Sequence, residues 1–560
     1  MDTRTLSYAH GASQVPLLGS TIGDLFDAAV AADPEAEALV VRHQGIRWTY
    51  AELKQRADEF GRGLMALGID TGDRVGIWAP NWSEWVVVQF ATAKIGAILV
   101  NVNPAYRTHE LKYVLEQSGC VALIIAPPFK TSDYGALLNE VVPELATSAT
   151  GELGSPALPE LRTIIAFGDQ QLRGALTWDE VVARSASVDP ATMAKRQGSL
   201  GFDDPINIQY TSGTTGLPKG ATLSHHSILN NGFFVGETLR MTARDRICIP
   251  VPFYHCFGMV LGNLAAVTHG ATMVIPSPVF DPLEALETAS EERCTALYGV
   301  PTMFIAMLGH ERFVDFDLTS LRTGIMAGAP CPEEVMKRVQ VDMHMQEVTI
   351  AYGMTETSPV SFQTRTDDPI DRRVASVGRV HPHVECKIID SDSGAVLPRG
   401  ETGELLSRGY LVMLGYWNNP EATTEAIDAA RWMHTGDLAT MDEGGYVSIV
   451  GRVKDMIIRG GENIYPREVE EFLYTHPKVQ DVQVIGVPDR KFGEQVMAWV
   501  VLKPGETASA DEMRDFCSGK ITHFKIPAYW RFVDGFPMTV TGKVQKFVMR
   551  DQAIEELGVC

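Results

Sequence analysis

The chain has 560 residues, which is too long for one hydrophobic core and implies at least two domains. Its apolar content of 45% and charged content of 21% are ordinary for a globular protein. The formal net charge of −22 argues against a nucleic-acid-binding protein, because phosphate contacts require clustered lysine and arginine.

The cysteines and the apolar runs indicate the cellular compartment in which we expect the protein. Eight cysteines are scattered without a C-x-x-C pair, which predicts reduced thiols and gives no indication of a zinc site. The first twenty residues lack the apolar segment of a signal peptide, and the longest apolar run, 91–102, is too short to cross a bilayer. We therefore expect a cytoplasmic protein without a transmembrane segment. Transient membrane contact and a homo-oligomer stay open.

Strand and helix patterns alternate through the first two thirds of the chain. Helical spacing occurs at 50–69 and 82–94. Short apolar runs that predict buried strands occur at 38–41, 74–79, 96–102, 119–127 and 162–167. A further repeat of this kind covers 294–350. Such alternation is typical of a parallel α/β sheet with helices on its faces.

The stretch YTSGTTGLPKG, residues 210–220, combines three glycines, four serine or threonine hydroxyls and one lysine. Glycines let successive backbone N–H groups converge on an anion, and Lys219 adds a positive charge. This composition, framed by two extended segments, predicts a loop that holds phosphate. It is not a P-loop, because Pro218 and Gly220 flank Lys219 where that motif requires Gly and Ser or Thr. A Gly- and Thr-rich surface turn is the alternative.

The pattern changes near residue 385. Short alternating runs with Gly and Asp turns predict antiparallel β structure there, and α+β structure follows Gly451. The predicted fold class is α/β: a large N-terminal domain of doubly wound sheets with a small β subdomain, residues 1–453, then an α+β C-terminal domain, residues 454–560.

Eight segments, in order along the whole chain, resemble the signature segments of the adenylate-forming superfamily. This superfamily includes acyl-CoA synthetases, aryl-CoA ligases, amino-acid adenylation domains and luciferases. The segments are YTSGTTGLPKG (210–220), PFYHCFG (252–258), AGAP (327–330), YGMTE (352–356), GELLSRGYLVMLGYW (403–417), TGD (435–437), GRVKDMIIRGGENIYPREVE (451–470) and PMTVTGK (537–543). Within the superfamily the chain is most similar to medium-chain-type fatty acyl-CoA synthetases.

The resemblance implies two half-reactions that use ATP, Mg²⁺ and CoA. A carboxylate first attacks the α-phosphate of ATP to give acyl-AMP and pyrophosphate, and a thiol then displaces AMP. The loop would hold the β- and γ-phosphates, residues 328–330 and Tyr352 would contact adenine, and Asp437 with Arg452 would contact ribose. The implied ATP/AMP-binding residues are Thr211, Ser212, Gly213, Thr214, Thr215, Gly216, Lys219, Gly328, Ala329, Pro330, Tyr352, Gly353, Met354, Thr355, Asp437 and Arg452.

Four residues are implied to be catalytic. Glu356 would bind Mg²⁺, and His255 would face the substrate carboxylate. Lys543 would neutralise charge where the carboxylate and the α-phosphate meet, and its acetylation would remove that charge. Lys454 matches the hinge about which the mobile C-terminal domain would rotate between the two half-reactions. Gly460 and Gly461 would then allow pantetheine to pass close to the backbone.

The acyl pocket is expected to be apolar and long. Aromatic residues, Cys and Gly stand where amino-acid adenylation domains carry an aspartate, which disfavours amino acids. Gly353 stands where acetyl-CoA synthetases carry a tryptophan, which leaves room for a longer tail. The expected pocket residues are Phe253, Tyr254, Gly258, Met259, Gly299, Met303 and Gly353. A medium-chain fatty acid is predicted, with long-chain or aryl acids as alternatives.

Other classes of enzyme share part of this pattern. A P-loop ATPase would release ADP rather than AMP. A luciferase-like oxygenase or a ligase for a carrier-protein phosphopantetheine shares every motif above, so free CoA is favoured by resemblance alone.

Overall fold

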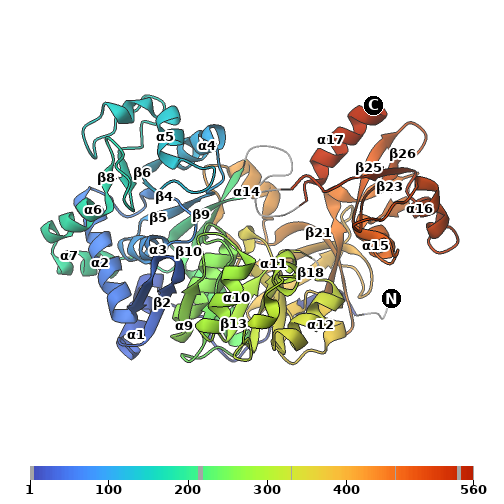
Figure 1. Cartoon of the computed structure of the whole chain (residues 1–560), viewed down its shortest axis with the longest axis horizontal. Coiled ribbons are helices and arrows are strands. Elements are labelled where there is room, and N and C mark those ends of the chain that lie inside the picture. Colours follow the sequence, from blue (N-terminus) through green and yellow to red (C-terminus); the bar gives the residue numbers. More distant parts are fainter. Residues whose placement is uncertain (1–4, 212–217, 330, 461, 539–543, 559–560) are drawn as a thin grey trace. The chain divides into compact units, whose positions relative to one another are not determined.

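The computed structural model describes residues 5–211, 218–329, 331–460, 462–538 and 544–558, and it confirms the α/β fold class (Figure 1). Contacts divide the chain into two compact units. A large unit contains residues 9–386 and 407–433, and a small unit contains 1–8, 387–406 and 434–560. The expected domain boundary at Lys454 falls inside the small unit, so the hinge stays a prediction.

The first sheet of the large unit has eight strands. Their order is β20 (Gly415–Tyr416), β10 (Lys219–Ser224), β9 (Pro205–Thr211), β5 (Ile98–Val102), β4 (Arg74–Trp78), β6 (Cys120–Ile125), β7 (Thr163–Ala166) and β8 (Leu176–Thr177). From β9 to β8 neighbouring strands are parallel, whereas β10 runs antiparallel to β9 and β20. Helices α4 (Thr108–Ser118) and α5 (Tyr134–Val141) lie on one side, and α2 (Tyr50–Ala66) and α3 (Ser83–Ile95) on the other (Figure 1). This is the arrangement that right-handed crossovers produce.

The second sheet of the large unit has nine strands. Their order is β17 (Arg379–Val380), β16 (Val360–Gln363), β15 (Glu347–Gly353), β14 (Thr323–Ala327), β13 (Ala296–Gly299), β11 (Arg246–Cys248), β12 (Thr272–Ile275), β2 (Glu37–Val41) and β3 (Ile46–Thr49). Leu286 of α10 (Pro282–Glu291), Met307 of α11 (Pro301–Leu308) and Met336 of α12 (Glu333–Asp342) share one buried core with these strands. Strands β13, β14 and β15 are parallel, so their carboxyl ends meet at one edge.

A buried lysine joins the helices of the large unit. Lys94 of α3 is 2% exposed, and its Nζ lies 2.7 Å from Asp27 Oδ1 of α1 (Ile22–Ala32) and also pairs with Asp58 of α2. Burial lowers the pKa of Lys94, and the two carboxylates oppose that shift. The positive charge of Lys94 is therefore stabilised by both Asp27 and Asp58.

The remaining two sheets include the strands of the small unit. The first has the order β1 (Tyr8–His10), β18 (Val384–Ile389), β19 (Gly403–Gly409), β21 (Met433–Met441) and β22 (Val447–Arg452). The second contains β24 (Glu462–Ile464), β23 (Ile457–Arg459), β26 (Gly493–Leu502) and β25 (Val479–Asp489), with β27 (Tyr529–Phe532) on β26. Helices α15 (Pro466–Leu473), α16 (Ala510–Cys517) and α17 (Lys546–Leu557) pack on these strands. The antiparallel pairing of β21 with β22 confirms the change of pattern predicted near residue 385.

Two whole-chain expectations concern cysteines and membranes. The seven cysteines in the described part of the chain are free thiols, and Cys560 lies outside it. No helix within the described ranges combines the length and apolar character that crossing a bilayer requires.

Candidate active site

The predicted phosphate loop is carried by a two-stranded frame. Thr211 ends β9 and pairs with Lys219, which begins β10. Helix α4 is tied to both strands: Tyr210 donates to Gln117 Oε1, and Tyr113 donates to the carbonyl of Pro218 at 3.1 Å. The ends of the loop are therefore fixed to the body of the sheet. Its other predicted residues, Ser212, Gly213, Thr214, Thr215 and Gly216, lie outside the described ranges.

Glu356 lies at the base of this frame. It belongs to a short turn, η6 (Thr355–Thr357), directly after β15, and it is 5% exposed. Its Oε1 accepts a hydrogen bond from Tyr416 Oη at 2.8 Å and from Thr211 Oγ1 at 3.3 Å. The Nζ of Lys219 lies 5.2 Å from the centroid of the Tyr416 ring. Tyr416 thus brings Thr211, Lys219 and Glu356 into one cluster.

Tyr416 remains a hydrogen-bond donor at neutral pH. Burial raises the pKa of its phenol well above the ordinary value, and the nearby Glu356 carboxylate raises it further. The phenol therefore keeps its proton and donates to the carboxylate.

The donor set at Glu356 fits Mg²⁺ on the condition that a nucleotide supplies further ligands. A carboxylate oxygen is the hard ligand that Mg²⁺ prefers, and such ions are commonly held by one or two carboxylates and substrate phosphates. No cluster of three or more His, Cys, Asp or Glu that could hold a metal occurs among the described residues. The phosphates beside the loop would supply the rest.

The predicted adenine-binding residues gather at the carboxyl edge of the nine-stranded sheet. Gly328 follows β14 with φ of +86°, a conformation that favours glycine, and both Gly328 and Ala329 are exposed. Tyr352, near the end of the adjacent strand β15, is partly exposed. Ligands of open α/β sheets bind at this kind of edge. Pro330 lies outside the described ranges.

Two of the glycines expected to line the acyl pocket lie directly against neighbouring backbone. A Cβ atom built on Gly353 would lie 1.7 Å from the carbonyl oxygen of Pro359, and one on Gly258 would lie 2.4 Å from that of Pro252. These two glycines therefore allow close approach of backbone to backbone, and their place in an acyl pocket stays a prediction. Met354 N also donates to Pro359 O at 3.0 Å, which fixes the turn before Glu356. Gly299 is different, since its Cβ would meet the Phe304 side chain at 3.1 Å.

Two of the expected pocket side chains are interior residues. Phe253 is fully buried, with its ring 5.6 Å from that of Trp85, and Met259 is 1% exposed. Their place on the wall of an acyl pocket stays a prediction. Tyr254 and His255, between them in sequence, are only partly buried, and Met303 packs at the edge of the core of the nine-stranded sheet.

The small unit places its predicted nucleotide residues together. Asp437 of β21 is the register partner of Arg452 of β22, and Arg452 Nε lies 3.3 Å from Asp437 Oδ1. Arg452 is 52% exposed, so it can reach a ligand bound to the carboxylate. Lys454 is exposed in the turn that follows, and Gly460 adopts φ of +61° while donating to Phe492 O at 2.7 Å. Lys543 and Gly461 lie outside the described ranges.

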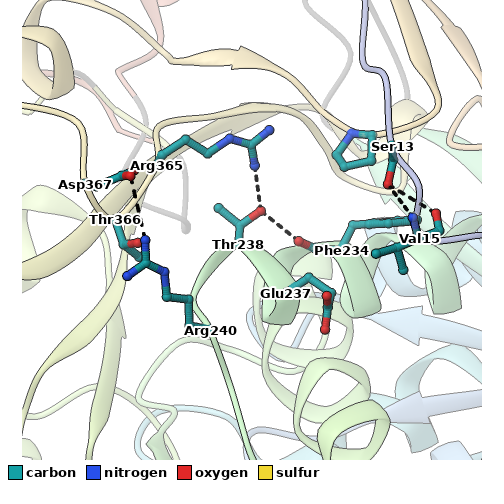
Figure 2. A pocket seen from close by; sticks show the side chains of 10 residues that line it. Ser13, Val15, Phe234, Glu237, Thr238, Arg240, Arg365, Thr366 and Asp367 are labelled. Carbon is teal, nitrogen blue, oxygen red and sulfur yellow. Dashed lines mark hydrogen bonds and ion pairs between the residues drawn. The ribbon is translucent and has the colours of Figure 1, made fainter.

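A separate hollow of about 270 Å³ in the large unit shares no residue with these motifs (Figure 2). Arg365 donates to Thr238 Oγ1 at 2.9 Å there, and Arg240 lies 3.7 Å from Asp367. Its cationic groups therefore contact the protein's own polar side chains.

The motifs did not identify three residues that organise this site. Tyr416 orients the Glu356 carboxylate, whereas Gln117 and Tyr113 of α4 hold the two ends of the loop. Tyr416 belongs to the quoted segment 403–417, so an aromatic hydroxyl in that segment was the available signal. The two residues of α4 belong to none of the motifs.

Comparison with known proteins gives consistent matches. Residues 26–417 match the family of AMP-binding enzymes, and residues 468–543 match the AMP-binding enzyme C-terminal domain. The chain is 51% identical over 539 residues to the putative acyl-CoA synthetase YngI of Bacillus subtilis (strain 168), covering 96% of this chain and 98% of that protein. It is 46% identical over 558 residues to the mitochondrial medium-chain acyl-CoA ligase ACSF2 of Bos taurus, covering 99% and 91%. The crystal structure of the anthranilate CoA ligase AuaEII in complex with anthranoyl-AMP matches with a TM-score of 0.83 and 26% identity, covering 97% of this chain and 99% of that one.

Proposed function

The chain belongs to the AMP-binding enzyme family, and from this premise we propose that it is an acyl-CoA synthetase whose substrate is a medium-chain fatty acid. Its relatives of 46–51% identity over nearly the whole chain are named acyl-CoA synthetase or medium-chain acyl-CoA ligase. AMP-binding enzymes of this kind use ATP and CoA. The convergence of Thr211, Lys219 and Glu356 on Tyr416 is the observation that carries the proposed site.

In the first half-reaction an oxygen of the fatty-acid carboxylate attacks the α-phosphate of ATP. The bond to pyrophosphate breaks, and acyl-AMP forms. Repulsion between the carboxylate and the phosphates is the main obstacle, so positive charge and N–H donors near the phosphates lower the barrier. Lys219 and the loop would hold the departing pyrophosphate, and Lys543 would neutralise charge where the two anions meet.

Glu356 would hold Mg²⁺, with Thr211 and Tyr416 orienting its carboxylate. The ion would supply charge neutralisation at the phosphate oxygens when bound. Asp437 would accept hydrogen bonds from the ribose hydroxyls, and Arg452 would contact the same sugar.

In the second half-reaction the CoA thiol attacks the acyl carbon and AMP leaves. A free thiol has a pKa of about 8.5, so a few per cent is already thiolate near neutral pH. Rotation of residues 454–560 about Lys454 would exchange Lys543 for the segment around Gly460.

The decisive experiment is a substrate panel of fatty acids from two to sixteen carbons, plus benzoate, with ATP, Mg²⁺ and CoA. We expect AMP and thioester to form together, with the highest kcat/KM for acids of medium length. Equal AMP formation without CoA would refute thioester formation. A maximum at acetate or benzoate would refute the proposed substrate.

Lys543→Ala tests whether the C-terminal domain uses different residues in the two half-reactions. We expect loss of acyl-AMP formation with thioester formation from supplied acyl-AMP retained. Loss of both half-reactions together would contradict the rotation. The same variant gives the reference for testing Lys543 acetylation, since both remove the charge.

For the compartment, we propose a reducing one such as the cytoplasm, because the seven described cysteines are free. The bovine relative is named mitochondrial, so the two locations are distinguished by fractionating cells that express the full-length chain.

A further inference from the structure

Six side-chain amides are buried beneath the segment from Val251 to Met259. They are at most 3% exposed and come from separate parts of the large unit: Asn81, Gln89, Asn101, Asn207, Gln209 and Asn263. An apolar side chain at each position would avoid the cost of about 1–3 kcal/mol for every buried polar group left without a partner. So many amides in one place therefore require a reason, and we call them the amide cluster.

Side chains of the amide cluster form hydrogen bonds with the backbone on both sides of His255. Asn81 donates to the carbonyl of Val251 at 2.9 Å and accepts from the N–H of Phe253 at 2.8 Å. Asn101 Nδ2 donates to the carbonyl of Tyr254 at 3.1 Å.

Beyond His255 the same pattern continues. The Cys256 thiol donates to Gln209 Oε1 at 3.1 Å, and Gln89 donates to the carbonyl of Met259 at 3.1 Å. The segment is thus held at five positions by side chains from other elements.

The helix that follows is unusual. Phe257–Leu264 forms an eight-residue π-helix, a rare form that frequently occurs at functional sites. Asn263 in its last turn donates to Gln89 Oε1 at 2.8 Å. Gln89 of α3 therefore contacts both Met259, near the start of the π-helix, and Asn263, near its end.

The amides also contact one another. Asn207 donates to Asn101 Oδ1 and Gln209 donates to Asn207 Oδ1, both at 2.9 Å. Asn101 and Gln209 each donate to the sulfur of Met259, at 3.2 and 3.1 Å. The side-chain oxygens of Asn101, Asn207 and Gln209 each accept from a donor, so the orientation of these three amides is fixed.

One strand links the amide cluster to the phosphate loop. Asn207, Gln209 and Thr211 alternate along β9 and therefore point to the same side of the sheet. Thr211 hydrogen-bonds Glu356, while Gln209, two residues earlier, holds Cys256. Strand β9 therefore helps to fix the positions of both the turn around His255 and the phosphate loop.

We propose that the amide cluster is a positioning network that aligns the Tyr254–Met259 turn, and hence the fatty-acid carboxylate, with the phosphates of ATP. Gln209 and Asn101 are its central positioning residues. This inference rests on the proposed function, in which the turn faces the acyl substrate. It assigns a role to side chains that touch neither substrate.

The test uses the full-length enzyme and compares kinetic constants for octanoate and for ATP. Cys256→Ala removes the donor to Gln209, and Cys256→Ser restores a donor of similar size. We expect Cys256→Ala to raise the KM for octanoate about tenfold, with the KM for ATP changed less than twofold, and Cys256→Ser to recover most of the loss. Asn101→Leu is expected to raise the octanoate KM further and to flatten the preference among chain lengths.

Asn230→Leu is the matched control. Asn230 is also fully buried, but its contacts are with Leu18 and His226, away from the turn. We expect it to lower thermal stability and leave both KM values unchanged. If the Asn101 variant behaves like this control, or if octanoate and ATP constants rise by the same factor, the positioning role is overturned. Failure of the proposed function is recognised separately, because the unmodified enzyme would then form no acyl-CoA.

Discussion

At the scale of single residues, Tyr416 is the residue on which the site depends most directly. Its hydroxyl is one of two hydroxyls that donate to Glu356 Oε1, and its ring lies beside Lys219. Tyr416→Phe removes the hydroxyl and keeps the ring. A hydrogen bond to a charged group contributes about 1.5–3 kcal/mol, so we expect kcat/KM for ATP to fall by roughly 10- to 150-fold. Pyrophosphate exchange into ATP measures this step.

Tyr113→Phe is the control for that experiment. It also removes one hydroxyl near the loop, but the lost bond goes to the neutral carbonyl of Pro218 and contributes only about 0.5–1.5 kcal/mol. An equal loss in both variants would contradict a special role for the Glu356 contact.

Gly353 gives a second prediction at this scale, one that reverses the expectation from resemblance. Gly353→Trp places a side chain against the carbonyl of Pro359, in the turn that leads to Glu356. We expect adenylation of acetate and octanoate to fall together by more than tenfold, because the turn must move. A variant that gained preference for acetate would support the original pocket hypothesis.

The sequence motifs name residues that the structure brings together, but they do not give the surroundings of those residues. Glu356, Thr211 and Lys219 could be named because their segments resemble a known order of motifs. The surroundings of Gly353 and Met259 could not be predicted, because the direction of a Cβ and the contacts of a sulfur depend on neighbours far along the chain.

At the scale of elements, the strands were the most predictable part of the fold. The apolar runs at 38–41 and 74–79 correspond to β2 and β4, since buried parallel strands are apolar on both faces. The π-helix Phe257–Leu264 was not predictable, because its apolar residues are compatible with an ordinary buried helix.

Helices α1, α2 and α3 meet at Lys94, whose charge is nearly inaccessible. Lys94→Met leaves Asp27 and Asp58 with Lys54 as their remaining shared cation. We expect a loss of about 1.5–3 kcal/mol in the free energy of unfolding, because both carboxylates lose a charged hydrogen-bond partner while Lys54 still compensates their charge. Urea denaturation followed by tryptophan fluorescence measures it.

Lys54→Met provides the comparison for Lys94. Lys54 contacts the same two carboxylates but is 32% exposed, so its loss should cost about 1 kcal/mol or less. A larger loss for Lys54 than for Lys94 would contradict this account of the buried charge.

At the scale of the whole molecule, two buried histidines make stability depend on pH. Burial lowers the pKa of His225 from 6.5 to about 4 and that of His381 to about 3. Below pH 6.5 the unfolded chain binds protons at these sites and the folded chain does not. The contribution of these two histidines to the free energy of unfolding is therefore fully present above pH 6.5. It decreases as the pH drops, by about 1.4 kcal/mol per pH unit for each histidine.

His225→Asn checks the sign and the source of this effect. The side-chain oxygen of asparagine can take the place of His225 Nδ1, which accepts a hydrogen bond from the N–H of Ile22 at 3.2 Å, but asparagine does not titrate. We expect a shallower slope of unfolding free energy between pH 6.5 and 5.5 than in the unmodified protein. An unchanged slope would assign the pH dependence to other groups.

The cysteines have a practical consequence for observing movement in this enzyme. Six of the seven described thiols are buried, and burial raises the pKa of the partly exposed one, Cys331, to about 12. Little thiolate is therefore present for alkylation at neutral pH. After Cys560→Ser, a pair of introduced surface cysteines could carry fluorescent dyes with little background labelling, and single-molecule energy transfer could then follow each turnover in real time.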